Sequence, residues 1–140
     1  MELEERNVSE KQGIIDWEKM RIRRGTMLML RAGYGAGEID VFFRRNAEAC
    51  SKKRIPFGVY WDSYAYSTDM AEKEAEYCAD TIEEYTLSGP VRFDFGEDSA
   101  RYVRSKGITV DRMFVEKLAE AFCKRMGELG YTPAAGKQPY

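Results

Sequence analysis

Three short apolar runs along the chain predict buried β-strands. The run at residues 26–32 is almost continuously apolar, and three glycines follow it closely. The runs at residues 57–61 and 91–95 each come directly after a proline. A run that is apolar on both faces is typical of a strand inside a parallel sheet. A weaker first strand is expected at residues 3–8, where only two residues are apolar.

Apolar residues at helical spacing predict helices between and after these strands. The first helix is expected from Asp40 to about Lys53, and the second from residues 67–69 to Ile82. The last begins at Thr109 or Asp111 and closes at a glycine, residue 130, as helices often do. A further short helix is expected at residues 16–20.

Strands and helices that alternate at intervals of roughly 30 residues predict right-handed βαβ crossovers and a parallel sheet. Four such units fit in 140 residues, whereas a complete (βα)₈ barrel needs about 200 residues or more. We therefore expect an α/β fold, a partial (half) β/α barrel of about four parallel strands. Its sheet is either open or closes by association. Residues 1–131 would form this domain, and residues 132–140 a loop-like tail.

Charge and composition argue against several classes of function. The chain has 22 Lys and Arg against 24 Asp and Glu, a net charge of −2, so it lacks a broad cationic surface for nucleic acid. No apolar run approaches the roughly 20 residues of a membrane span. Histidine is absent, which removes imidazole catalysis and His-based metal sites. We expect no metal, no cofactor, and neither nucleic acid nor membrane as a partner.

The N-terminal residues and the cysteines bear on the cellular location. Residues 1–7 contain no apolar segment of the kind that a secretory signal needs. Cys50, Cys78 and Cys123 form no CxxC motif, and each falls on the apolar side of a predicted helix. Such thiols are typical of small buried hydrophobes in a reducing compartment. We therefore expect synthesis in the cytoplasm without a signal peptide.

Five sequence blocks follow one another along the chain. They are Asn-Val-Ser-x-x-Gln-Gly-x-Ile-Asp-Trp at 7–17, Leu-Arg-Ala-Gly-Tyr-Gly at 30–35, Asp-x-x-Phe-x-x-Asn-x-x-Ala at 40–49, Ile-Pro-Phe-Gly-Val-Tyr-Trp at 55–61 with Ser-Tyr-Ala at 63–65, and Pro-Val-x-Phe-Asp-Phe at 90–95. In this order and spacing they resemble the family 25 glycoside hydrolases, the Chalaropsis-type lysozymes. The resemblance covers about residues 7–131. It implies a β/α barrel that cleaves peptidoglycan, in the cell wall outside the cell, between N-acetylmuramic acid and N-acetylglucosamine.

The resemblance also implies a catalytic Asp-x-Glu on the fourth strand and an Asp on the first. Asp94 matches the Asp of that motif, but Gly96 occupies the Glu position and a glutamate, Glu97, comes one residue later. A shift of one residue along a strand turns a side chain to the opposite face, so Glu97 replaces the acid only if the strand ends or bulges there. The first-strand Asp is replaced by Asn7, and the family's His by Lys11. We therefore expect weak or absent turnover.

Aromatic and charged residues at the strand ends are candidates for sugar binding. Aromatic faces suit the apolar faces of sugar rings, and strand neighbours such as Tyr60 and Trp61 cannot both face one groove. Arg31 is expected to be a charge partner for Asp94. The predicted substrate-binding residues are Tyr34, Tyr60, Trp61, Asp62, Tyr64 and Arg31.

Three functions remain open from the sequence. The first is a lysozyme-family hydrolase with weak or no turnover on peptidoglycan glycan chains. The second is a glycan-binding protein without catalysis. The third is a half-barrel that associates with itself, because a parallel sheet of this kind leaves two open edges and an apolar face meant for a barrel interior. On that ground we expect a homodimer or a larger assembly.

Overall fold

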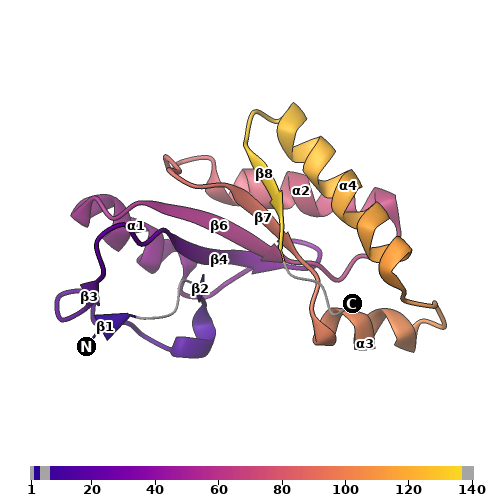
Figure 1. Ribbon diagram of the computed structural model, residues 1–140, viewed down its shortest axis with the longest axis horizontal. Helices are drawn as coiled ribbons and strands as arrows, with labels where there is room; N and C mark the ends of the chain where they lie inside the picture. The colour runs from indigo at the N-terminus through magenta and orange to yellow at the C-terminus, as the bar shows by residue number, and fades with distance from the viewer. Residues whose placement is uncertain (1, 4–6, 137–140) are drawn as a thin grey trace.

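A computed structural model describes residues 2–3 and 7–136 of the chain, and it shows one main sheet with helices packed on it (Figure 1). Five parallel strands lie in the order β2-β4-β6-β7-β8, and β5 pairs with β4 in the antiparallel sense. A separate small sheet joins β1 to β3. The strands are β1 (Glu2–Leu3), β2 (Asn7–Val8), β3 (Arg21–Ile22), β4 (Leu28–Tyr34), β5 (Glu38–Ile39), β6 (Phe57–Asp62), β7 (Val91–Asp94) and β8 (Pro133–Ala135).

Four α-helices and one short 3-10 helix, η1 (Glu10–Gln12), connect these strands. Side-chain caps begin the two longest helices: Ser67 accepts a hydrogen bond from the Met70 amide, and Asp111 accepts one from the Phe114 amide. The α-helices are α1 (Phe43–Lys53), α2 (Thr68–Ile82), α3 (Glu97–Ser105) and α4 (Arg112–Glu128). Among the described residues, no helix is long and apolar enough to cross a membrane.

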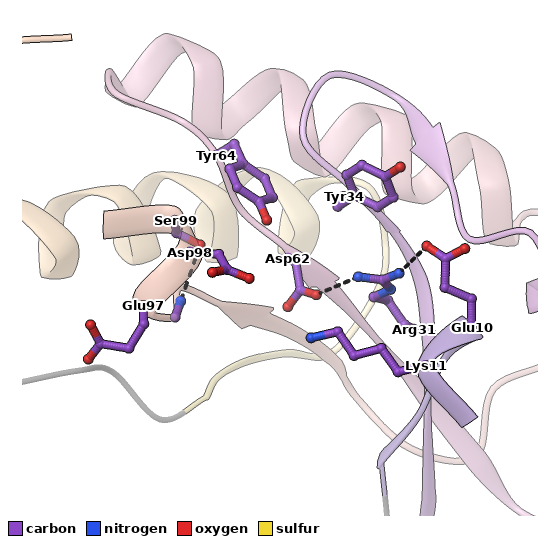
Figure 2. Close-up of a pocket in the computed structure, with 10 residues that line it drawn as sticks. Glu10, Lys11, Arg31, Tyr34, Asp62, Tyr64, Glu97, Asp98 and Ser99 are labelled. Carbon is purple, nitrogen blue, oxygen red and sulfur yellow. Dashed lines mark hydrogen bonds and ion pairs between the residues drawn. The ribbon is translucent and has the colours of Figure 1, made fainter. Parts of the chain in front are cut away.

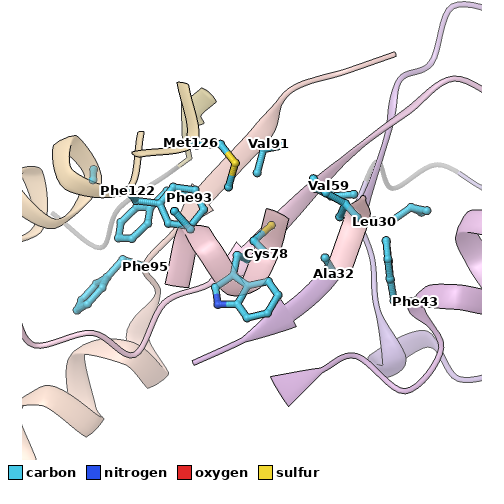
Figure 3. Close-up of a cluster of buried hydrophobic side chains, with 14 of the residues drawn as sticks. Leu30, Ala32, Phe43, Val59, Cys78, Val91, Phe93, Phe95, Phe122 and Met126 are labelled. Atoms are coloured by element: carbon cyan, nitrogen blue, oxygen red, sulfur yellow. The ribbon is translucent and has the colours of Figure 1, made fainter. Parts of the chain in front are cut away.

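One buried cluster fills the space between the sheet and α1, α2 and α4 (Figure 3). Strand residues alternate between the two faces of the sheet, and on β6 Val59 and Trp61 belong to this cluster whereas Tyr60 does not. On β7, Phe93 packs against Phe122 of α4 with ring centroids 5.2 Å apart. The helix side of the sheet is therefore the apolar side.

The other face of the sheet is polar, which corrects the expectation of an apolar face. Arg31 of β4, Tyr60 and Asp62 of β6, and Arg92 and Asp94 of β7 alternate with the core residues of their strands. Because charged side chains occupy it, this face does not offer the hydrophobic surface that was expected to drive self-association.

The predicted fold class is confirmed: the chain is a partial β/α barrel whose parallel sheet is not closed. Three local expectations differ from the structure. Pro133–Ala135 form a fifth parallel strand where a loop-like tail was expected, α3 was not predicted, and residues 16–20 form a turn instead of a helix. Part of the expected first strand, residues 4–6, lies outside the described residues. The domain boundary at residue 131 stays a prediction.

Candidate functional site

A polar pocket of about 570 Å³ lies at the carboxyl ends of β4, β6 and β7 (Figure 2). Parallel strands end at the same edge of a sheet, so residues far apart in the sequence meet there. The lining residues are Glu10 and Lys11 of η1, Arg31 and Tyr34 of β4, Asp62 of β6, Tyr64 of the loop after β6, and Gly96, Glu97, Asp98 and Ser99 at the start of α3.

Arg31 holds three carboxylates at the floor of this pocket. Its Nε donates to Asp40 Oδ2 at 2.8 Å, its Nη1 to Asp62 Oδ2 at 3.0 Å, and its Nη2 to Glu10 Oε1 at 2.6 Å. Burial by itself lowers the pKa of Arg31, but the hydrogen bonds that it donates to Asp40 and Asp62, together with the negative charges of these two carboxylates, outweigh burial and raise that pKa. The guanidinium therefore stays charged and fixes the position of the acidic side chains.

Asp62 is the most perturbed acid of the pocket. Burial raises the pKa of its carboxyl, the nearby charge of Asp94 adds to the rise, and the hydrogen bond from Arg31 opposes it. The side chain is still 28% exposed toward the pocket. The carboxyl of Asp62 at the end of its strand can therefore accept a hydrogen bond from a ligand in the pocket.

Asp94 has a different partner from the one predicted. Arg92, two residues earlier on the same strand, donates from Nε to Asp94 Oδ1 at 2.6 Å and from Nη2 to Asp94 Oδ2 at 2.8 Å. Arg92 also donates to Asn7 Oδ1 at 3.2 Å and lies over the Tyr60 ring, 4.9 Å from its centroid. The predicted pair between Arg31 and Asp94 is therefore wrong, and Asp94 and Asn7 do not line the pocket.

The acidic residues after β7 point in different directions. β7 ends at Asp94, Gly96 caps α3, and the Ser99 hydroxyl accepts a hydrogen bond from the Gly96 amide at 3.2 Å. Figure 2 shows the carboxylate of Glu97 pointing away from the pocket, whereas Asp98 points toward Asp62. Asp98 also pairs with Arg101 at 2.8 Å and is exposed. Of the two acids at the start of α3, Asp98 is thus the one whose carboxylate faces the pocket.

Two of the predicted aromatic residues line the pocket and two do not. Tyr34 and Tyr64 stand in its wall with ring centroids 6.3 Å apart, and Arg31 lies over the Tyr34 ring. Trp61 is fully buried in the core, where its Nε1 donates to the Gly35 carbonyl at 3.1 Å. Tyr60 faces the side of the sheet opposite to Trp61, as alternation requires, but lies under Arg92 outside the pocket. Trp61 and Tyr60 are therefore not pocket residues.

A buried glutamate on α2, Glu74, fixes the loop that carries Tyr64. The Ser63 hydroxyl donates to Glu74 Oε1 at 2.6 Å, and the Tyr64 amide donates to Oε2 at 2.8 Å. Burial raises the pKa of this carboxyl to about 7. Sequence reasoning missed Glu74, although its position three residues after Ala71 and four before Cys78 puts it on the apolar side of the helix and was a usable signal.

No group of three metal-binding side chains occurs in residues 2–3 and 7–136, the part of the chain that the structure describes. The candidate site is therefore built from carboxylates, one buried guanidinium, a lysine and two tyrosines. An open parallel sheet with such a pocket at the carboxyl ends of its strands defines the molecule as a partial β/α barrel with a polar ligand site.

Solved structures of two bacterial proteins share this fold. The modular autolysin LytC from Streptococcus pneumoniae superposes with a TM-score of 0.72 and 24% identity, over 91% of this chain and 30% of that chain. The same autolysin in complex with a synthetic peptidoglycan ligand gives 0.73 and 25% over the same shares. A family 25 glycosyl hydrolase from Bacillus anthracis gives 0.60 and 24%, over 86% of this chain and 55% of that one.

The catalytic domain of endolysin ply40, from bacteriophage P40 of Listeria monocytogenes, superposes with a TM-score of 0.70 and 14% identity, over 92% of this chain and 60% of that one. The chain thus spans less than two-thirds of the length of each of these structures. No protein-family model and no curated protein matches the sequence. The structural likenesses confirm the resemblance to the family 25 glycoside hydrolases that the sequence blocks indicated.

Proposed function

We propose that this chain binds the glycan strands of bacterial peptidoglycan in the pocket at the carboxyl ends of its strands, with weak or no hydrolytic turnover. The observation that carries the proposal is the lining of that pocket, where fixed carboxylates, Lys11 and two tyrosines converge. Charged groups can hydrogen-bond sugar hydroxyl and acetamido groups, and tyrosine rings suit the apolar faces of sugars. The likeness to LytC, solved with a synthetic peptidoglycan ligand, supports this choice of ligand.

Weak or absent turnover follows from the acids near the pocket. Glycoside hydrolysis normally uses two carboxyl groups with different pKa values on either side of the scissile bond. Both oxygens of Asp94 are occupied by Arg92, Gly96 supplies no acid, and Glu97 points away. Loss of a well-placed acid costs about 10²–10⁴-fold in rate.

The binding proposal is tested with a peptide-free disaccharide of N-acetylglucosamine and N-acetylmuramic acid in calorimetric titrations. Lys11 points into the pocket (Figure 2), so Lys11→Ala should weaken binding by about tenfold. The matched control is Lys117→Ala, on the exposed surface of α4, which should leave binding unchanged. No heat of binding with the unmodified chain, or equal effects of the two substitutions, would contradict the proposal.

Residual hydrolysis is the second candidate function, because Asp98 faces Asp62 across the pocket. In this alternative the two carboxyl groups share the acid and base roles. Clearing of a bacterial wall suspension tests it: Asp98→Asn should abolish clearing, and Glu97→Gln should not. No clearing by the unmodified chain at high concentration would leave binding as the function.

Self-association is a separate proposal, which concerns the edges of the sheet. β2 and β8 are the outer strands of the main sheet, and unpaired edges can add a strand from another molecule.

A ligand in the bacterial wall requires the chain to reach that wall. Synthesis in the cytoplasm without a signal peptide stays a prediction.

A further inference from the structure

A second cavity, of about 290 Å³, lies on the other side of Tyr64 from the pocket. Tyr64 lines both cavities, so its ring forms part of a wall between them. The second cavity is bounded by the turn between β4 and β5, by the first half of α2 and by Tyr102 of α3. Gly35 and Tyr64 of the sequence blocks line this cavity, and its other lining residues lie outside those blocks.

Three tyrosines make the lining of this cavity largely aromatic. The rings of Tyr64 and Tyr102 meet edge to face with centroids 5.7 Å apart, and Tyr77 of α2 completes the aromatic lining. Tyr77 and Tyr102 are 38% and 40% exposed, although large aromatic side chains are usually more buried. Exposed rings that gather around a hollow offer flat apolar faces to a ligand.

Charged groups complete the lining in a way that suits a polar ligand with an apolar face. Asp69 and Lys73 both line the cavity, and within the described part of the chain the side chain of neither forms a hydrogen bond or an ion pair. A pyranose ring presents C–H groups on its faces and hydroxyl groups around its edge. Tyrosine rings can pack on those faces while a carboxylate and an ammonium group accept and donate hydrogen bonds at the edge.

We propose that this cavity is a second sugar subsite, which holds a pyranose of the same glycan strand whose neighbouring sugars occupy the pocket. The inference rests on the proposed function, because it assigns the continuation of that strand. Tyr64 lines both cavities, so they lie next to each other, and Glu74 holds the Tyr64 backbone in place. A strand long enough to pass Tyr64 therefore gains contacts that a disaccharide cannot reach.

The test compares peptide-free glycans of two and four sugars by calorimetric titration. The unmodified chain should bind the tetrasaccharide about three- to tenfold more tightly than the disaccharide. Tyr77→Ala and Tyr102→Ala should remove most of this gain and leave disaccharide affinity unchanged. Tyr66→Ala is the matched control, since Tyr66 is 37% exposed but lies outside both cavities, and it should keep the gain.

A second variant separates the loss of the subsite from a loss of folding in the tyrosine variants. Ala36→Trp fills the cavity from an exposed position in the turn after β4, and it should remove the gain without loss of packing. Equal affinities of the unmodified chain for the two glycans would overturn the second subsite while the proposed function stands. No binding of either glycan would overturn the proposed function itself. If affinity above that for the peptide-free disaccharide is found only with a disaccharide that carries its stem peptide, the cavity binds the peptide and the sugar subsite is overturned.

Discussion

Arg31 shows how much of the candidate site depends on one side chain. It is 8% exposed and bonded to Glu10, Asp40 and Asp62, which come from three different segments of the chain. Taking a cation and its partners out of water is costly, so removal of one partner leaves buried charge without compensation. The same guanidinium therefore serves both the fold and the geometry of the pocket.

Arg31→Met should lower the free energy of unfolding by about 3–5 kcal/mol, because the fully buried Asp40 and the partly buried Asp62 and Glu10 lose their counter-charge. Urea denaturation measures this change. The control is Arg112→Met, since Arg112 is 78% exposed and pairs only with Glu116 on α4, and exposed pairs contribute about 0–1 kcal/mol. Similar losses in the two variants would show that Arg31 is not the centre of the network.

The raised pKa of Glu74 predicts how the stability of the fold depends on pH. Its pKa of about 7 in the folded chain lies above the ordinary 4.5, so the folded state holds the proton more tightly than the unfolded state. This contribution is fully present below pH 4.5 and is lost as the pH rises through about 7. Relative to Glu74→Gln, the unmodified chain should therefore lose about 3 kcal/mol of stability between those limits.

Urea denaturation from pH 4 to 8 measures that difference, and Glu120→Gln is the control because Glu120 is exposed on α4. The control should follow the unmodified chain at every pH. A constant offset between the unmodified chain and Glu74→Gln would show that the Glu74 carboxyl keeps an ordinary pKa in the folded state.

Residue types at the strand ends were visible in the sequence, but their partners were not. Arg31, Asp62, Tyr34 and Tyr64 were expected near the site and line the pocket. Arg92 and Asp94 are two residues apart on one strand, so their side chains share a face and the arginine reaches the aspartate. This pairing was missed because Asp94 was paired with Arg31 instead. The direction of Asp98 depends on where β7 ends and α3 begins, and single-residue shifts of that kind are not fixed by composition.

At the scale of elements, β8 shows how a strand forms from a sequence that does not favour one. Pro133, Ala134 and Ala135 have low strand propensity, and this is why a loop was expected there. Backbone hydrogen bonds hold them: the Val91 amide donates to the Thr132 carbonyl at 2.9 Å, and the Gly136 amide to the Phe93 carbonyl at 2.8 Å. The position of β8 is thus set by tertiary pairing with β7, which no local pattern reveals.

Gly136 lies directly against the ion pair of Arg92 and Asp94. A Cβ at residue 136 would collide with Asp94 Oδ1 and lie 3.0 Å from Arg92 Nε. Gly136→Ala should therefore lower the free energy of unfolding by about 1–3 kcal/mol. Thermal denaturation measures it, with Gly127→Ala as the control. Residue 127 lies on the exposed side of α4 with open space around it, so alanine there should raise stability by about 0.5–1 kcal/mol.

α3 escaped sequence reasoning for a related reason. Its buried side is small, with Ser99, Ala100 and Val103 as the buried residues, and charged residues occupy most of its other positions. Such a helix shows no continuous apolar stripe, whereas α2 and α4 do and were predicted within a few residues. Gly96 as its cap is the signal that could have located its start.

At the scale of the whole molecule, the alternation of strands and helices was enough to predict the partial β/α barrel, because a parallel sheet follows from the period of the units. The helix-facing side of the sheet was predictable as well. The polar opposite face was not, since a run such as residues 28–34 shows one arginine among apolar residues and gives no sign of the carboxylates that surround it.

Oligomeric state is the prediction that belongs to this scale. The two outer strands, β2 and β8, are short, with two and three residues, and pairing of their edges is the route to self-association that we propose. Light scattering at micromolar concentration should give a dimer or a larger species if the edges pair. A monomeric mass would contradict the expectation of a homodimer.

The order of the strands has a consequence for how the chain is made. Each parallel strand of the main sheet lies beside the parallel strand that precedes it in the sequence, β2 next to β4 and so on to β8. Chains emerge from the ribosome N-terminal end first, and contacts between near neighbours in sequence form fastest. The sheet can therefore grow strand by strand from β2 toward β8 during synthesis.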